Sequence, residues 1–65
     1  MKVSYFNDTD SLYIELKASD VSETRDLDEN TILDLDSHGN IVGITMEHAS
    51  ARTDVHKLKL SGIAA

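Results

Sequence analysis

Cysteine and proline are absent from this 65-residue chain, and basic residues and long apolar runs are scarce. Without cysteine there is no disulfide framework, no zinc–thiolate site and no thiol nucleophile. No apolar run is longer than the four residues 41–44, whereas a membrane-spanning helix needs about 20. The 6 Lys and Arg residues are outnumbered by 12 Asp and Glu, which gives a net charge of −6. Such a chain lacks the cationic face that phosphate-driven nucleic-acid binding requires.

The first residues lead straight into patterned sequence and do not resemble a signal peptide. We therefore expect a cytoplasmic protein with no membrane association. A chain of about 60 residues buries only about 60% of its unfolded surface, so a single core is marginal. Since disulfides are excluded and no metal site is credible, we expect self-association into a dimer or a larger homo-oligomer.

Apolar and polar residues alternate through most of the first 46 residues, which is typical of β-strands. The expected strands cover residues 2–6, 11–16, 21–28, 31–36 and 41–46. Polar turn residues separate them, and the first two strands form a clear hairpin. The third strand carries charges on both of its faces, so we expect it at a sheet edge. The pattern predicts a mostly β, α+β fold with a five-strand antiparallel meander.

The turn at residues 37–40 has the clearest local chemistry in the chain. Gly39 can take the positive φ of a hairpin turn, with Asn40 beside it, and Asp36 can accept hydrogen bonds from the turn amides. Gly43, inside the last strand, indicates a close backbone approach or a bulge.

Alternation ends after residue 46. Residues 47–52 are good helix formers and predict a short C-terminal helix. Residues 53–60 fit a strand or a helix equally well, and residues 61–65 read as a frayed tail. We therefore expect one β-rich domain over residues 1–52, followed by an extension over residues 53–65.

No group of residues in the sequence predicts a metal or cofactor site. Residues 34–39 begin like a calcium loop, but His38 and Thr45 occupy the places where an oxygen ligand and a bidentate glutamate are needed. His38, His48 and His56 show no recognised ligand spacing. We therefore read residues 34–39 as a hairpin turn and expect no metal and no cofactor.

The aromatic and charged residues offer candidates for an interface. Tyr5 and Tyr13, on the first hairpin, either pair across strands within the sheet or anchor a partner. Residues 17–36 have a charge balance of −5 and residues 52–60 one of +2. This asymmetry is either a solvated surface or a sign that acidic and basic segments meet across an interface, for example with a small basic protein. The candidate interface residues are Tyr5, Tyr13, Asp26, Asp28, Glu29 and Arg52.

Three ordered blocks of this sequence are similar to a known family. Residues 5–14, Y-F-N-D-T-D-S-L-Y-I, resemble the opening Y-D-x-x-x-D-x-L-Y-I of domain of unknown function 2283. Residues 23–24 and 34–44 resemble its middle, E-T … D-x-D-x-x-G-x-I-V-G-I, and Ala49-Ser50 falls on its A-S pair. The similarity covers residues 1–52, although Phe6 and Asn7 replace the usual acidic residue after Tyr5, which disfavours a binding role there.

The resemblance implies a small prokaryotic β-rich protein with no assigned activity. Members of the family are often encoded beside small proteins suspected to be toxins. The resemblance therefore implies an antitoxin-like role at the level of the family.

Three functional hypotheses follow, and we favour the first. It is a non-enzymatic protein-interaction module that self-associates through an apolar sheet face or the helix. The second is a minimal enzyme with a site formed between subunits by His48, Ser50 and either Asp34 or Asp36. The third is a nucleic-acid-linked regulator that uses Arg52, Lys57 and Lys59. No nucleophile elbow or Gly-rich loop supports catalysis, and a chain this short has little room for a ligand pocket.

Overall fold

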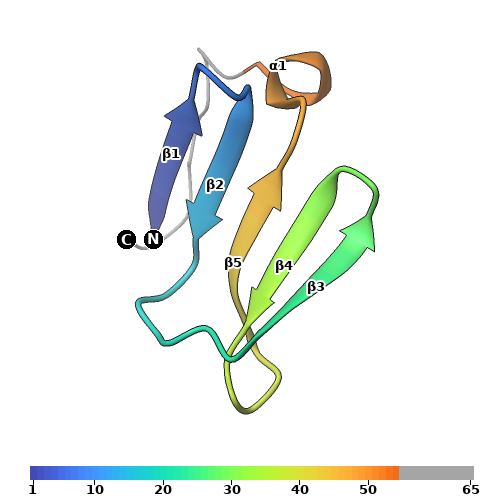
Figure 1. Cartoon of the computed structure of the whole chain (residues 1–65). Coiled ribbons are helices and arrows are strands. Elements are labelled where there is room, and N and C mark those ends of the chain that lie inside the picture. Colours follow the sequence, from blue (N-terminus) through green and yellow to red (C-terminus); the bar gives the residue numbers. More distant parts are fainter. Residues whose placement is uncertain (55–65) are drawn as a thin grey trace.

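The computed structural model describes residues 1–54 as one five-stranded antiparallel sheet followed by a single helical turn (Figure 1). The elements are β1 (Lys2–Phe6), β2 (Ser11–Glu15), β3 (Glu23–Asp28), β4 (Thr31–Leu35), β5 (Ile41–Met46) and α1 (Ala49–Arg52). The five expected strands and the short helix are present, but β3 and α1 each begin two residues later than expected, and β2 and β4 each end one residue earlier. The choice between strand and helix for the following segment, and the frayed tail, lie outside the described residues apart from Thr53 and Asp54.

The order of the strands in the sheet is β1-β2-β5-β4-β3, so the prediction of a consecutive meander is wrong. Strands that follow one another in the sequence pair with each other, except that β2 does not pair with β3. Its second neighbour in the sheet is β5. The loop of residues 16–22 (loop 16–22) instead carries the chain past two strands to the far edge (Figure 1). Three strand spacings of about 4.8 Å are within reach of seven residues in extended form.

The composition of the strands explains this order. All six residues of β3 are exposed, and four of them are charged, which suits an edge and discourages pairing with another sheet. The expectation that this strand lies at an edge is confirmed. β5 is rich in aliphatic residues and lies in the centre, between β2 and β4.

The register of the strands separates the side chains onto two faces of the sheet, because neighbours in register share a face. One of them, the apolar face, carries Val3, Leu12, Ile14, Leu33, Leu35, Ile44 and Met46. The other, the polar face, carries Ser4, Tyr13, Glu15, Ile32, Asp34 and Thr45, with Phe6 at its edge. Leu12 and Leu35 are buried on the apolar face, but its other five residues are only half-buried.

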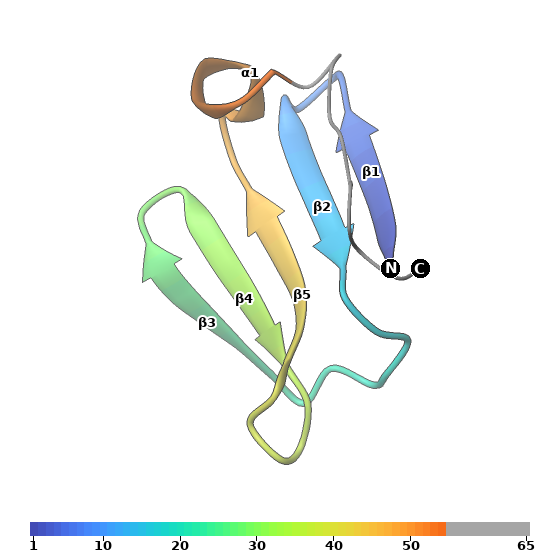
Figure 2. The same ribbon diagram turned by 180° about the vertical axis from the view of Figure 1, so that it is seen from behind.

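The sheet is a single layer, and α1 lies beyond the ends of β2 and β5 rather than across a face (Figure 2). The molecule accordingly measures 33 × 29 × 17 Å. Only Leu12, Leu35, Val42 and Ala49 are buried hydrophobic residues in the described part of the chain. No helix within residues 1–54 is long and apolar enough to cross a membrane.

The turn between β4 and β5 confirms the turn chemistry. Gly39 has a φ of +83°, in the region where a β-carbon is strained. The Asp36 carboxylate accepts hydrogen bonds from the backbone amides of His38 and Asn40, each at 2.9 Å. The Asn40 side-chain amide adds a weaker bond to it at 3.4 Å. Asp36, Gly39 and Asn40 therefore hold this turn together.

Candidate functional site

Tyr13 projects from β2 and lies over Gly43 of β5. A β-carbon built on Gly43 would stand 2.9 Å from Cζ of the tyrosine, closer than side chains approach one another. The ring reaches this position because glycine leaves the backbone of β5 bare. The close approach expected at Gly43 is confirmed, and a register irregularity between β4 and β5 lies beside it.

The phenol of Tyr13 begins a polar chain across the sheet. Its Oη atom donates a hydrogen bond to Asp34 Oδ2 at 3.1 Å, and Thr24 Oγ1 donates to Asp34 Oδ1 at 3.3 Å. Partial burial raises the pKa of the Tyr13 phenol, and the charges of Asp34 and Glu15 raise it further. Tyr13 therefore stays a neutral donor in a region of negative potential.

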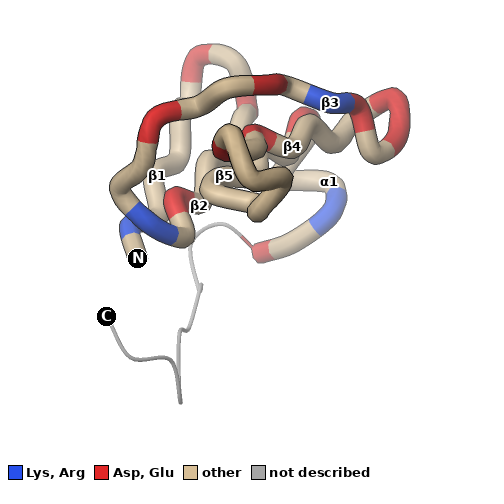
Figure 3. Tube along the Cα trace, turned by 90° about the horizontal axis from the view of Figure 1, so that it is seen from below, with Lys and Arg blue, Asp and Glu red and all other residues tan. Residues whose placement is uncertain are grey.

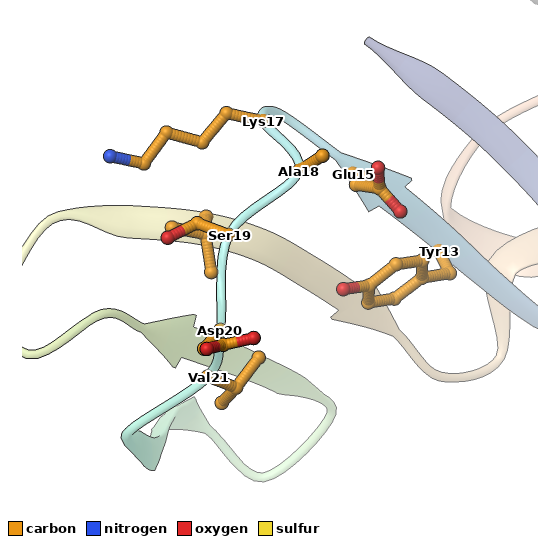
Figure 4. Close-up of a pocket in the computed structure, with 8 residues that line it drawn as sticks. Tyr13, Glu15, Lys17, Ala18, Ser19, Asp20 and Val21 are labelled. Carbon is orange, nitrogen blue, oxygen red and sulfur yellow. The ribbon is translucent and has the colours of Figure 1, made fainter.

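A pocket of about 420 Å³ opens beside the Tyr13 ring, between β2 and loop 16–22 (Figure 4). Main-chain hydrogen bonds at both of its ends hold the loop in place. Leu16 N–H donates to the Val42 carbonyl at 2.8 Å, and Ser22 N–H donates to the Leu35 carbonyl at 2.8 Å. The pocket is lined by Tyr13, Glu15, Lys17, Ala18, Ser19, Asp20, Val21 and Val42.

Lys17 is the one basic residue in the pocket lining, but its charge is already paired. Its Nζ atom lies 2.9 Å from Asp36 Oδ2, and its side chain extends away from Tyr13 (Figure 4). Lys17 and the turn amides hold the pKa of Asp36 well below its usual range. Glu15 and Asp20, by contrast, form no ion pair with any residue of the described chain.

Asp10 joins the β1–β2 turn to α1, a contact that sequence reasoning missed. Its carboxylate accepts hydrogen bonds from Tyr5 Oη at 2.6 Å, Ser50 Oγ at 2.8 Å and Ser50 N–H at 3.1 Å. Its carbonyl accepts from Ala49 N–H at 2.9 Å. The hydrogen bonds from Tyr5 and Ser50 lower the pKa of Asp10, and the bond between Tyr5 and Asp10 also raises the pKa of Tyr5. A φ of +54° at Asp10 suits aspartate better than most residues.

The residues of the enzyme hypothesis are not brought together within one chain. Ser50 donates its hydroxyl proton to Asp10 rather than to a histidine, and His48 lies close enough to Asp10 to lower its pKa. Asp34 and Asp36 belong to the clusters around Tyr13 and Lys17. Within residues 1–54, no three His, Asp or Glu side chains gather where they could hold a metal ion.

The two tyrosines do not pair across strands, so that interpretation is wrong. Tyr5 stands opposite Leu12 and Tyr13 opposite Ser4, which places the tyrosines on opposite faces of the sheet. The strict alternation of side chains in β1 and β2 separates them.

The remaining interface candidates lie around the β3–β4 turn. Asp28 accepts a hydrogen bond from Asn30 N–H at 2.8 Å, which is a structural contact. Asp26 and Glu29 are exposed. Arg52 donates hydrogen bonds to the Asn30 carbonyl and to Thr31 Oγ1, both at 2.7 Å. Its guanidinium therefore links α1 to the β3–β4 turn. His56, Lys57 and Lys59 lie outside the described residues.

The acidic residues recur along loop 16–22, β3 and the turn that follows it (Figure 3). This stretch includes the acidic side of the pocket at Asp20 and the acidic edge strand. The described part of the chain thus shows an acidic border on the sheet, next to a polar face that contains the pocket.

Comparison with known proteins gives one finding. No curated protein and no solved structure matches this chain. The protein family of unknown function DUF2283 matches residues 2–50, which span all five strands and the start of α1. The match includes Tyr5, Asp10 and Ser50, the residues that fasten the first hairpin to the helix. The chain belongs to the DUF2283 family.

Proposed function

We propose that this protein is a non-enzymatic protein-interaction module that self-associates through its apolar face. One observation carries the proposal: five aliphatic side chains of that face, Val3, Ile14, Leu33, Ile44 and Met46, are only half-buried in the described residues. Protein domains are built from at least two packed layers, because an apolar sheet face is stable only when another element covers it.

A second copy of the chain fits this face in size. The molecule measures 33 × 29 Å in its two longer dimensions, and a standard interface buries about 800 Å² on each partner. A two-fold dimer requires only that the face be complementary to itself, since both partners contribute the same surface. The dimer would supply the second layer that the described residues lack.

The distribution of charge also permits this contact despite the net charge of −6. Glu15, Asp26 and Asp34 are on the polar face, away from the contact. On the apolar face, Glu23 is paired with Arg25, whose Nε donates to Glu23 Oε2 at 3.0 Å. Two apolar faces can therefore meet with little repulsion between unpaired charges.

Sedimentation equilibrium tests the proposal with a matched pair of variants on β4. Leu33 lies on the apolar face and its neighbour Ile32 on the polar face, and both are half-buried. The wild type should sediment as a dimer or larger at micromolar concentration. Leu33→Glu should shift it to the monomer, and Ile32→Glu should not. A wild type that is a folded monomer would overturn the proposal.

We further propose an antitoxin-like role, in which the same module binds a different protein through its acidic border. The acidic residues of loop 16–22, β3 and the β3–β4 turn suit a small basic protein, since opposite charges accelerate encounter. Co-expression with the product of the adjacent gene, followed by co-purification, tests this role. A stoichiometric complex whose association slows when salt rises from about 50 to 500 mM would support it. Failure to form a complex with that product would rule this role out.

A further inference from the structure

The pocket beside Tyr13 combines three features that suit a cation. An aromatic ring forms one wall, and carboxylates flank the space on both sides: Glu15 on β2 and Asp20 on the loop (Figure 4). The basic residue of the lining is turned away and held by Asp36. We propose that this pocket binds the guanidinium group of an arginine side chain on a partner protein.

The electrostatics favour a positive group here over an anion or a neutral one. Glu15 and Asp20 carry charges that no described residue neutralises. Lys2, opposite Glu15 in the register, does not form an ion pair with it. Asp34 adds further negative charge at the far end of the Tyr13 ring. A cation that binds here therefore pairs with carboxylates that do not have to give up an existing ion pair.

The lining of the pocket favours arginine over a lysine or a small amine. A planar guanidinium can stack on the Tyr13 ring while its separate N–H groups reach Glu15 and Asp20. Lysine offers a compact ammonium that cannot make both contacts in one plane. The pocket opens to the surface and has few groups to fix a small molecule, whereas a side chain is held by the rest of its own protein.

This inference goes beyond self-association, because the pocket and the apolar face are on opposite sides of the sheet. A dimer formed through the apolar faces leaves both pockets open. The pocket is open to a partner whether or not the chain dimerises. The proposal of self-association and the proposal of arginine binding can therefore fail independently.

The test is an NMR titration of the full chain with N-acetyl-arginine-N-methylamide. N-acetyl-citrulline-N-methylamide serves as the control, since citrulline has the same shape without the charge. We expect amide shifts over residues 13–21 with the arginine derivative and none with citrulline. Sedimentation of the same samples reports the oligomeric state independently.

Two pairs of variants locate the binding. The double variant Glu15→Gln with Asp20→Asn should weaken binding about fivefold or more. It removes no hydrogen bond or ion pair of the described chain, and the dispersion of its spectrum checks that it folds. Asp26→Asn with Glu29→Gln removes the same charge from β3 and its turn, and should leave binding nearly unchanged.

Three outcomes would overturn the inference. In the first, both double variants lose affinity equally, which would show a response to overall charge. In the second, citrulline shifts the same amides as arginine does. In the third, spermidine binds at residues 13–21 and the arginine derivative does not, which would make the occupant a free polyamine.

Discussion

The aromatic ring of Tyr13 occupies the space that a side chain on Gly43 would need. The two residues lie on adjacent strands, β2 and β5, and the contact fills the polar face beside the pocket. Each residue thus restricts what the other can be. The contact also orients the phenol toward Asp34, to which it donates a hydrogen bond.

Gly43→Ala should therefore destabilise the fold. The added methyl group would meet Cζ at 2.9 Å and Cε1 at 3.2 Å, and the strand backbone and the ring would have to move apart. Overpacking of this kind costs about 1–3 kcal/mol. Urea denaturation of the two proteins gives the difference directly.

A double-mutant cycle shows whether the cost arises from this contact. In a Tyr13→Ser background the ring is gone, and Gly43→Ala should then cost little or improve stability by restricting the unfolded chain. An equal cost in both backgrounds would mean that Gly43 is needed for the conformation of β5 and not for the ring.

Gly39→Val should disrupt the β4–β5 hairpin. Gly39 has a φ of +83° with open space where a β-carbon would stand, so the cost arises from the backbone and not from a clash. A β-branched residue in that region costs on the order of 1–2 kcal/mol. Gly39→Asn is the control, because asparagine tolerates positive φ and should lose less. A loss below about 0.5 kcal/mol for valine in a denaturant melt would contradict the assignment.

Acid should weaken the fold through Asp36. Its pKa is lowered in the folded state by Lys17 and the turn amides, while an unfolded aspartate titrates near about 3.9. The contribution of Asp36 to stability is therefore complete above that pH and is lost as the pH falls toward the lower, folded value. Urea melts at about pH 7, 4 and 2.5 should show this decline.

Asp36→Asn identifies the group responsible. The variant should be less stable than the wild type at neutral pH, and its stability should fall less between neutral and acidic pH. Asp10, whose pKa is also lowered, accounts for part of the remaining decline. Parallel profiles for the two proteins would show that Asp36 is not the titrating group.

Asp10→Ala should loosen α1 more than Asp10→Asn does. Asparagine keeps an acceptor for Tyr5 and Ser50 and tolerates the positive φ of this position, whereas alanine does neither. Hydrogen exchange at the Ser50 amide, which donates to Asp10 at 3.1 Å, measures the effect. Equal exchange rates in both variants would mean that the helix is held by other contacts.

Local patterns in the sequence predicted the elements of this fold but only part of their arrangement. Alternation located the strands, and charges on both faces of β3 placed it at an edge. The type of turn at Gly39 followed from the residues themselves. The pairing of β2 with β5 did not, because a period of two does not specify which strand lies beside which.

The candidate site could not be predicted either, because its contacts depend on the order of the strands in the sheet. The Asp10 contacts join residues 40 positions apart, and no local pattern connects them. The pocket exists because loop 16–22 lies beside Tyr13 as it leaves β2 and crosses toward β3, a path set by the strand order. Gly43 was the one local signal, since a glycine inside a strand indicates that another group comes close.

The placement of β5 between β2 and β4 has a consequence for how the protein folds. Hairpins such as β1–β2 and β3–β4 can form from neighbouring residues as soon as each is available. The two halves of the sheet, however, join only through β5, whose pairing with β2 links Leu12 to Met46. During synthesis the N-terminal hairpin must therefore wait, with its apolar side open, until almost the whole sheet has left the ribosome. Closing such a long loop is slow compared with local pairing, so this joining step is expected to limit the folding rate.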